Sequence, residues 1–596
     1  MTHHFHIPVL GLAFSIDTPV KVAHLGISSV ISIVDDELIE RMRAFHCHQA
    51  GLPYYAITPD QDDYRAKRIE SYLNLVSFLV STNTHRLRNS SMEENSEIHQ
   101  YFHFLPQDHP AKVIYHQMLS ESDPALKIKL QTDLRKFIEP GQIEVNIMSK
   151  VDKINMNTQK QPLDEKFSDA LAALRGSAKC ELELSLVLSA GMNPRLYAYL
   201  GELEEFRMDK NGKTQKKIVL KVSDYRSALI QAKFLAKKGV WISEFRIESG
   251  LNCGGHAFAT DGYLLGPILE EFKNKKETLV QELYELYAKA LGSNPHNTPL
   301  PDTKITVQGG IGTAEEQDLL MQYYQMNGTG WGSPFLLVPE ATTVDQDTLV
   351  ALSHATLDDF YVSGASPLGV PFNNFRHSSA ELQRLDRIAK NRPGSPCVKK
   401  YLVSNTEFTK EPICTASRKY QHLKIKQLEN AELSPEEHKR QLNDVLEKTC
   451  LCEGLSASAY IKNDILKSKE NRSVAICPGP NLAWFNRSYS LKEMVDHIYG
   501  RVNLLQHAPE RPNLFVNELQ LYMEHLKQFI GSNQNNLHDK TKKYITKFRD
   551  ELTAGIDYYE KLCHQTPKVS PVFSKQMLSQ LQDAKNELER PDYYVF

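Results

Sequence analysis

Residues 249–258 read SGLNCGGHAF and combine residue types that redox and acid–base chemistry use. The side chain of His256 titrates near neutral pH, so it is suited to act as a general base. Gly254 has no Cβ atom and would let a flat ring lie against the main chain. Cys253 is either a neighbouring proton donor or an inert loop residue, because only a thiol with a lowered pKa is reactive. The segment therefore predicts a catalytic loop, with a purely structural histidine as the alternative.

Two glycine clusters follow later in the chain, TVQGGIGTAEE at 306–316 and NGTGWGSPF at 327–335. Glycine lets main-chain amides approach an anion without a Cβ atom in the way. We expect a helix to begin after Gly312, with Thr313 as its N-cap and Glu316 completing a capping box. The N-terminal end of that helix would add a favourable dipole, and Ser333 offers a hydroxyl group. The clusters predict a phosphate site, although a tight strand–helix turn would also use glycine.

The first two thirds of the chain alternate short apolar runs with amphipathic stretches. This alternation is typical of a (β/α)₈ TIM barrel, an α/β fold, and a doubly wound open sheet is the alternative. In a barrel the catalytic loop and both glycine clusters would emerge at the carboxyl ends of the strands, where active sites lie. The expected strands are 7–14, 26–34, 143–148, 181–191, 217–222, 240–248, 304–312 and 330–338.

The bulk properties narrow the class of protein. The chain has 596 residues and a formal net charge of −3, which gives no general attraction to nucleic acid or to an anionic membrane. It contains no apolar run of 18 residues, so we expect no membrane span. The N-terminal sequence lacks the pattern of a signal peptide, and the odd number of cysteines, nine, suits a reducing compartment. We expect a cytoplasmic protein with a small-molecule substrate, in an oligomeric state that the sequence leaves open.

Composition divides the chain into three expected parts. Residues 1–376 form the barrel, with a helical insertion at about 59–140 after an early strand. Residues 377–490 are rich in Cys, Pro, Lys and Asn, and residues 491–596 read as helices. Basic clusters at 416–427 and 540–549 are typical of a solvated helix face. A second interpretation of these clusters is an RNA-binding or RNA-modifying flavoprotein.

Five cysteines fall within the middle part of the chain. Four thiolates suffice for a [4Fe-4S] cluster, and Zn²⁺ accepts the same ligands. No C-x₂-C spacing occurs, so buried thiols without a metal are the alternative. The candidate metal ligands are Cys397, Cys414, Cys450, Cys452 and Cys477.

Residues 7–376 resemble the nitronate monooxygenase (2-nitropropane dioxygenase-like) family of FMN-binding TIM barrels. The resemblance rests on GGH at 254–256, QGGIG at 308–312, WGSPF at 331–335, the Val145-Asn146 pair, and SGASPLGVPFNNFR at 363–376. The chain departs from the family pattern at Asn252-Cys253, where the family has Glu-Ala. It also departs in the first strand, which reads GLAF at 11–14, and in its length.

The resemblance implies an FMN-dependent oxidoreductase in which His256 removes a proton from the substrate. It also implies which residues surround the cofactor. The phosphate would lie on Gly309, Gly310, Gly332 and Ser333, with Gly330 and Trp331 bordering it. The flavin ring would lie near Asn146, Ser249, Gly254 and the main chain of Ala13. Lys221, on the fifth expected strand, is either near the flavin or a strand-end surface lysine. Because similar barrels reduce enoyl thioesters in lipid and polyketide synthesis, such a reductase is a second enzyme interpretation.

Overall fold

We analysed the chain in a computed structural model. The structure describes residues 2–148, 152–157, 159, 161–209, 214–254, 260–292, 300–533, 538–565 and 571–593.

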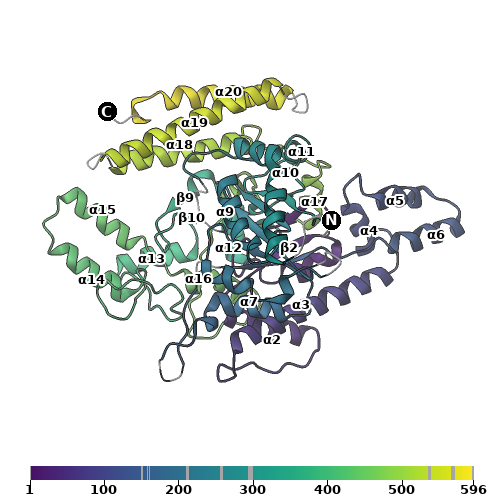
Figure 1. The fold of residues 1–596 in the computed structure, drawn as a ribbon, viewed down its shortest axis with the longest axis horizontal. Coiled ribbons are helices and arrows are strands. Elements are labelled where there is room, and N and C mark those ends of the chain that lie inside the picture. The colour runs from purple at the N-terminus through teal and green to yellow at the C-terminus, as the bar shows by residue number, and fades with distance from the viewer. Residues whose placement is uncertain are drawn as a thin grey trace.

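Within the described residues, eight parallel strands close into a barrel, which confirms the predicted fold (Figure 1). The first strand pairs with the last, with His6 opposite Gly330, so no sheet edge is left open. Side chains on both faces of most strands are buried, as expected where helices cover the outside and side chains fill the inside. The strands are β1 (Phe5–Ile7), β2 (Ser28–Ile33), β3 (Ile143–Ile147), β4 (Leu184–Leu188), β5 (Lys216–Val222), β6 (Glu244–Glu248), β7 (Lys304–Gln308) and β8 (Gly328–Gly330).

Helices follow the strands and form the outer layer (Figure 1). The helix after β7 begins as predicted, because Thr313 and Glu316 form a capping box in which each side chain accepts a hydrogen bond from the main chain of the other. The helices of this region are α1 (Thr18–Val22), α2 (Asp36–Gln49), α3 (Tyr64–Asn89), α7 (Asp169–Lys179), α8 (Pro194–Leu200), α9 (Tyr225–Ala236), α10 (Leu265–Ala290), α11 (Ala314–Gln322) and α12 (Gln346–Ser353).

Two expected strands are largely wrong. Residues 8–14 do not continue β1, because proline at position 8 cannot donate to a strand ladder and the chain turns at Gly11, whose φ is +145°. Residues 333–337 form a 3₁₀ helix instead of extending β8, with proline at position 334 in its first turn. Both segments are apolar because they are buried, and burial alone does not distinguish a strand from a compact turn.

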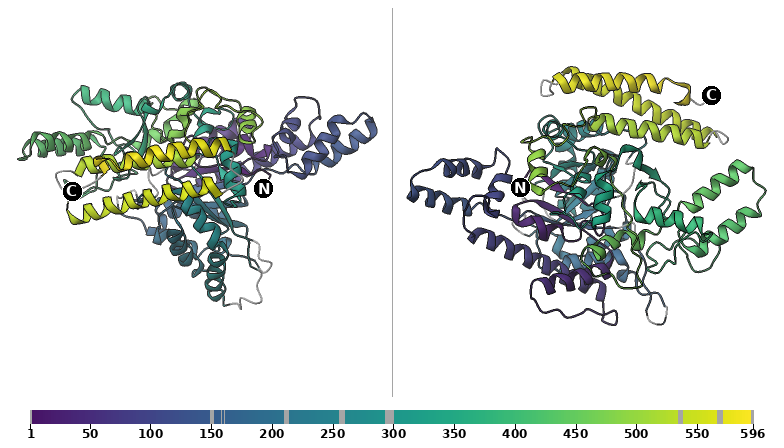
Figure 2. Two further views of the ribbon diagram at one scale, coloured as in Figure 1. Left: turned by 90° about the horizontal axis from the view of Figure 1, so that it is seen from above. Right: turned by 180° about the vertical axis from the view of Figure 1, so that it is seen from behind.

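The predicted insertion contains α3 and three shorter helices, α4 (Glu97–Phe104), α5 (Pro110–Ser120) and α6 (Pro124–Arg135). α3 packs against α2 and α7 in the outer layer of the barrel. The shorter helices project from the barrel and enclose a separate apolar cluster around Phe102 (Figures 1 and 2). The projecting part of the insertion is therefore α4–α6.

The chain after the barrel begins with a hairpin and helices that lie beside it. This part comprises β9 (Phe360–Ser363), β10 (Phe372–Phe375), α13 (Ser379–Ala389), α14 (Arg418–Glu429), α15 (Pro435–Leu446) and α16 (Leu451–Lys462). The last part comprises α17 (Leu491–Ile498), α18 (Leu514–Asn533), α19 (Asp539–Gln565) and α20 (Pro571–Leu588). Figures 1 and 2 show α18, α19 and α20 stacked along one side of the molecule. No described helix is both long and apolar enough to cross a membrane.

Charged side chains cross the interior of the barrel. The guanidinium group of Arg246 on β6 donates two hydrogen bonds to Glu144 on β3, at 2.6 and 2.9 Å, and one to Glu244, at 2.8 Å. Arg246 is 1% exposed. Burial raises the pKa of Glu144, although the attraction of Arg246 opposes this shift. The cation therefore compensates two acids that would otherwise face each other in a dry interior.

We predict that Arg246→Met lowers the free energy of unfolding by about 3–5 kcal/mol, because it leaves two buried carboxylates without their cation. Arg440→Met removes an equal charge from the exposed surface of α15 and should cost less than about 1 kcal/mol. Urea unfolding followed by circular dichroism measures both changes. Equal losses in the two variants would contradict a stabilising role for the interior cation.

Candidate active site

A cavity of about 570 Å³ opens at the carboxyl ends of β1–β6. Its floor is made of residues at the strand ends, including Ser32, Asn146, Lys221 and Glu248. Its outer wall comes from β10 and from segments of the chain that follow the barrel, including Phe372. The cavity lies where barrel enzymes place their active sites.

Glu248 is the centre of the polar floor. Its carboxylate accepts hydrogen bonds from the side chains of Gln308 at 2.8 Å and of Asn252, and it pairs with Lys221 at 3.1 Å. Lys221 and Glu248 are only 12% and 11% exposed. The predicted Lys221 therefore faces the cavity, and its partner Glu248 is a site residue that sequence analysis missed. An acidic residue at the carboxyl end of the buried strand segment FRIE is the sequence feature that could have identified Glu248 as a site residue.

Asn146 presents an unused acceptor to the same cavity. Its amide nitrogen lies 3.4 Å from the hydroxyl oxygen of Ser32, whereas its buried Oδ1 has no hydrogen-bond partner within the described chain. A buried acceptor without a donor costs about 1–3 kcal/mol. The floor therefore fits a ligand that brings an N–H or O–H donor to Asn146.

The glycine cluster after β7 packs closely against the turn after β6. Gly309 and Gly310 have φ angles of +102° and +82°, which favour glycine. A Cβ atom on Gly309 would lie 2.6 Å from the hydroxyl oxygen of Ser249, and one on Gly310 would lie 2.5 Å from Leu251. The Ser249 hydroxyl also donates to the carbonyl oxygen of Gly309 at 2.8 Å. The two glycines are thus required by the fold of these loops, whatever ligand they bind.

The ends of β7 and β8 nevertheless carry main-chain amides without partners. For the part of the chain that the structure describes, no hydrogen bond is recorded from the amides of Gly309, Gly310, Ile311, Gly332 and Ser333. Unpaired amides are rare in a protein interior, and grouped amides bind anions. These residues do not line the cavity itself, but Ser249 and Leu10, which do, touch Gly309 and Gly332. The predicted phosphate residues therefore lie beside the cavity, with Gly309 behind Ser249 and Gly332 behind Leu10.

Three predicted residues lie away from the cavity. Gly330 is inside the barrel, where a Cβ atom would lie 2.9 Å from the His6 ring. Trp331 is fully buried and donates to the side chain of Gln317 at 2.9 Å. The Ala13 amide donates to a carbonyl oxygen of α16 at 3.0 Å. These residues support the loops around the site and are not part of its lining.

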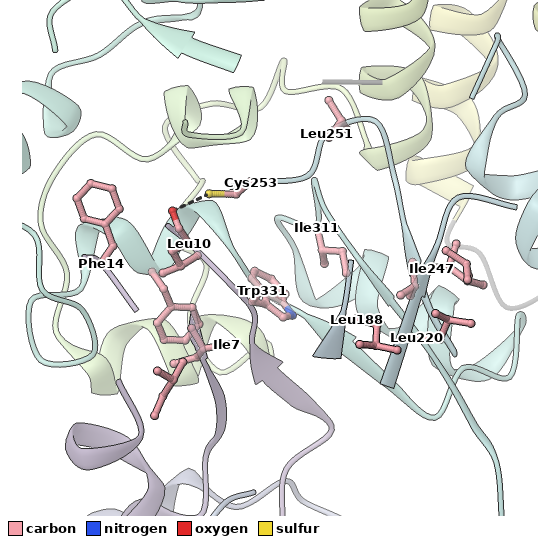
Figure 3. Packing of buried hydrophobic residues seen from close by; sticks show 14 of the residues in the cluster. Ile7, Leu10, Phe14, Leu188, Leu220, Ile247, Leu251, Cys253, Ile311 and Trp331 are labelled. Atoms are coloured by element: carbon pink, nitrogen blue, oxygen red, sulfur yellow. Dashed lines mark hydrogen bonds between the residues drawn. The ribbon is translucent and has the colours of Figure 1, made fainter. Parts of the chain in front are cut away.

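Cys253 and Gly254 are held by the segment after α16. The thiol of Cys253 donates to the carbonyl oxygens of Cys477 at 3.3 Å and Leu10 at 3.8 Å (Figure 3), and the Gly254 amide donates to Cys477 at 3.0 Å. Burial raises the pKa of the Cys253 thiol to about 12, so the thiol stays protonated. This favours the inert interpretation of Cys253. His256, like all of residues 255–259, lies outside the described residues.

The chain beyond the barrel fixes the ends of this loop. The buried carboxylate of Glu518 on α18 accepts hydrogen bonds from the amides of Gly250 at 2.8 Å and Leu265 at 2.7 Å. The Gly266 amide donates to the hydroxyl of Tyr559 on α19 at 3.0 Å. Burial raises the pKa of Glu518 from 4.5 to about 7, although the two amides oppose this shift. One carboxylate therefore joins both described ends of the segment that carries the predicted base.

The structure does not support the zinc or iron–sulfur prediction. The described residues, which include all five candidate cysteines, contain no group of three or more metal-ligating side chains that could hold an ion. Cys477 lies beside Cys253, whereas Cys397 hydrogen-bonds with Cys414, an interaction that lowers the pKa of Cys397 to about 7. Cys450 is the N-cap of α16, and Cys452, in its first turn, lines the cavity. The C-x-C spacing reflects the start of a helix.

No family model and no curated protein matches the chain. Solved structures that match include the enoyl reductase domain of MlnA from the macrolactin cluster of Bacillus amyloliquefaciens, at 13% identity over 69% of this chain and 89% of that one, with a TM-score of 0.32. FabK from Thermotoga maritima matches at 14% identity over 66% and 84%, with a TM-score of 0.30. Nitroalkane oxidase from Streptomyces ansochromogenes matches at 9% identity over 85% and 96%, with a TM-score of 0.33. At such identities and TM-scores, the matches establish neither a family nor a reaction.

We predict that Glu518→Gln changes the pH dependence of stability. Because the pKa of Glu518 is higher in the folded chain, the stability from its protonation is fully present below pH 4.5 and is lost as pH rises through about 7. Relative to the variant, the wild type should lose up to about 3 kcal/mol of unfolding free energy across that window. Urea unfolding at a series of pH values measures this difference. Glu524→Gln, on an exposed part of the same helix, should leave the profile unchanged. Parallel profiles for wild type and Glu518→Gln would contradict the assignment.

Proposed function

We propose that the chain is a flavin-dependent oxidoreductase that holds FMN at the mouth of its barrel. The observation that carries the proposal is the group of main-chain amides without partners at the ends of β7 and β8, directly beside the cavity. Barrels commonly bind phosphate at this position. The residues that resemble the nitronate monooxygenase family lie in the same loops.

The proposed cofactor fits the polar groups at both ends of the site. The amides of Gly309, Gly310, Gly332 and Ser333 would hold the phosphate. The Ser333 hydroxyl accepts the Gly479 amide at 3.0 Å and lies within hydrogen-bonding reach of the Cys253 sulfur, so its proton would have to turn from that sulfur to the phosphate. At the other end, Oδ1 of Asn146 would accept an N–H of the ring system, and Lys221 and Ser249 would border it. When bound, FMN would supply two-electron redox chemistry.

The chain's own groups would prepare the substrate. His256 is the proposed base that takes a proton from the substrate. Cys253 remains a protonated thiol bound to two carbonyl oxygens, so it serves the loop and not the reaction. Glu248 fixes the Lys221 ammonium group at the floor of the cavity, where its remaining N–H groups would donate hydrogen bonds to a bound ligand.

The outer wall favours a substrate with an alkyl part. Its apolar side chains come from Leu368, Val370, Pro371 and Phe372 and from Leu402, Leu451 and Leu455, and the barrel adds Met192 and Ile230 opposite the polar floor. Apolar walls with few polar groups recognise hydrocarbon by excluding water. An alkyl nitronate fits the leading interpretation. The extent of the wall favours, as a second candidate, an enoyl thioester reduced with electrons from a nicotinamide.

Comparison of FMN with riboflavin tests the two ends of the site separately. Ser333→Asp places a negative charge where the phosphate would lie. Because like charges in contact cost several kcal/mol, FMN should bind to this variant about 100-fold more weakly than to the wild type. Riboflavin has no phosphate, so its affinity should change by less than about threefold. Asn146→Ala should weaken both ligands about tenfold, since each loses the same acceptor. Quenching of flavin fluorescence measures the affinities. Failure of the wild type to bind FMN, or an equal effect of Ser333→Asp on both ligands, would contradict the proposal.

A second experiment tests the reaction. The FMN-loaded chain is mixed anaerobically with decyl nitronate, or with a reduced nicotinamide followed by a decenoyl thioester, and the flavin absorbance is followed by stopped flow. His256→Asn should slow the step that requires proton removal by about 10²–10⁴-fold and leave the FMN affinity unchanged. Reduction by the nitronate supports the leading substrate, and reoxidation by the thioester supports the second. No response to either substrate would contradict both.

A further inference from the structure

A second cavity, of about 880 Å³, lies in the chain that follows the barrel. It is a groove between the end of α13, residues 391–396, one face of α14 along its whole length, and the end of α15. Figure 1 shows α14 and α15 projecting to one side of the barrel, below α18–α20. We call this site the α14 groove. It shares none of its lining residues with the cavity at the barrel mouth.

The α14 groove is strongly basic. Its lining includes one acid, Glu429, and the basic side chains Arg392, Arg418, Lys419, His422 and Lys426. Among the ion pairs between described residues, none involves the guanidinium or ammonium group of these arginines and lysines. The whole chain carries a net charge of −3, so this positive charge is a local feature.

Three further observations indicate that the positive charge is not compensated. The Nε atom of Arg418 is buried and has no hydrogen-bond partner within the described structure. Burial lowers the pKa of the neighbouring Arg387, and the positive charge of Arg418 lowers it further; Cys450, Glu453 and Asp386 oppose this shift. The first turn of α14 also contains Arg418 and Lys419 in place of acids, which places cations at the positive end of the helix dipole. An anion would relieve each of these costs.

The shape and chemistry of the groove indicate the class of ligand. Arginine and lysine in a concave site bind phosphate groups, and arginine can do so with two parallel hydrogen bonds. Apolar side chains lie between the cations, from Ile388, Pro393, Ile425, Leu442 and Leu446. A phosphate ester with an apolar or aromatic part would meet both kinds of surface. The cations line a concave cavity, which favours a small ligand over a nucleic-acid backbone lying on an open surface.

We propose that the α14 groove binds a small phosphate ester, such as a nucleoside diphosphate, at a site separate from the barrel mouth. The groove is connected to the mouth through a short stretch of chain, since Ser395 lines the groove and Tyr401 lines the mouth cavity. Six residues span at most about 20 Å. The proposal does not depend on the bound flavin or on the reaction.

Titration calorimetry of the FMN-saturated full chain at low salt tests the proposal, with ADP as the probe. We expect saturable binding with a Kd below about 1 mM that weakens with added salt. The variant Lys419→Gln/Lys426→Gln replaces two exposed groove cations and should bind ADP at least tenfold more weakly. Arg392→Gln, at another side of the groove, should give a loss in the same direction. Lys543→Gln/Lys547→Gln removes equal charge from exposed positions on α19 and should leave the affinity unchanged.

Three outcomes decide between ligands. Binding of ADP that is tighter than binding of pyrophosphate, and that depends on the groove cations, supports a phosphate ester held by both charge and apolar contact. Absence of saturable ADP binding, or an equal loss in the α19 control, overturns the proposal. Tighter binding of a 12-nucleotide single-stranded DNA than of ADP, lost in the groove variant, would instead indicate a nucleic-acid surface and would also overturn it.

Discussion

The buried carboxylate of Glu316 joins the barrel to the chain that follows it. One oxygen accepts the Gly312 amide at 2.7 Å, and the other accepts the guanidinium group of Arg511 and the amide of Leu514, both at 2.7 Å. Glu316 is 2% exposed. A buried ion pair stabilises a protein only when all of its hydrogen-bonding groups have partners. The guanidinium group of Arg511 meets this condition, because it also donates to the side chain of Asn481 and to the carbonyl oxygen of Gly310. The same side chain that caps α11 therefore fixes the position of the later helices.

This connection changes the role of the C-terminal part of the molecule. Segment 477–482 binds Gly254, Ser333 and Ile311, which belong to the loops after β6, β8 and β7. Glu518 then joins the start of the loop after β6 to the start of α10. Each interaction fixes main-chain atoms of a loop that borders the proposed cofactor. The chain beyond the barrel is thus part of the site's architecture, and the barrel alone would leave these loops without their partners.

The sequence predicts the barrel well because its apolar runs alternate regularly with amphipathic stretches. It also predicts the start of α11, because Thr313 and Glu316 form a motif that is local in the sequence. It fails at residues 8–14 and 333–337, where long-range packing, and not local preference, buries the apolar side chains. Sequence analysis does not identify Glu248 as a site residue, because its partners Lys221 and Gln308 are far away in sequence. The cysteine pattern suggests a metal site that the structure does not support: Cys397 and Cys414 lie together, but the described residues hold no group of three or more ligands suited to an ion.

We propose that the amides at the ends of β7 and β8 hold the phosphate of a flavin whose ring lies over Asn146. A crystal structure of the full chain grown with FMN tests this claim most directly. We expect phosphate oxygens within about 3 Å of the amide nitrogens of Gly309, Gly310 and Ser333, with a ring nitrogen donating to Oδ1 of Asn146. An electron-density map with the phosphate elsewhere, or with the barrel mouth free of flavin, would contradict it.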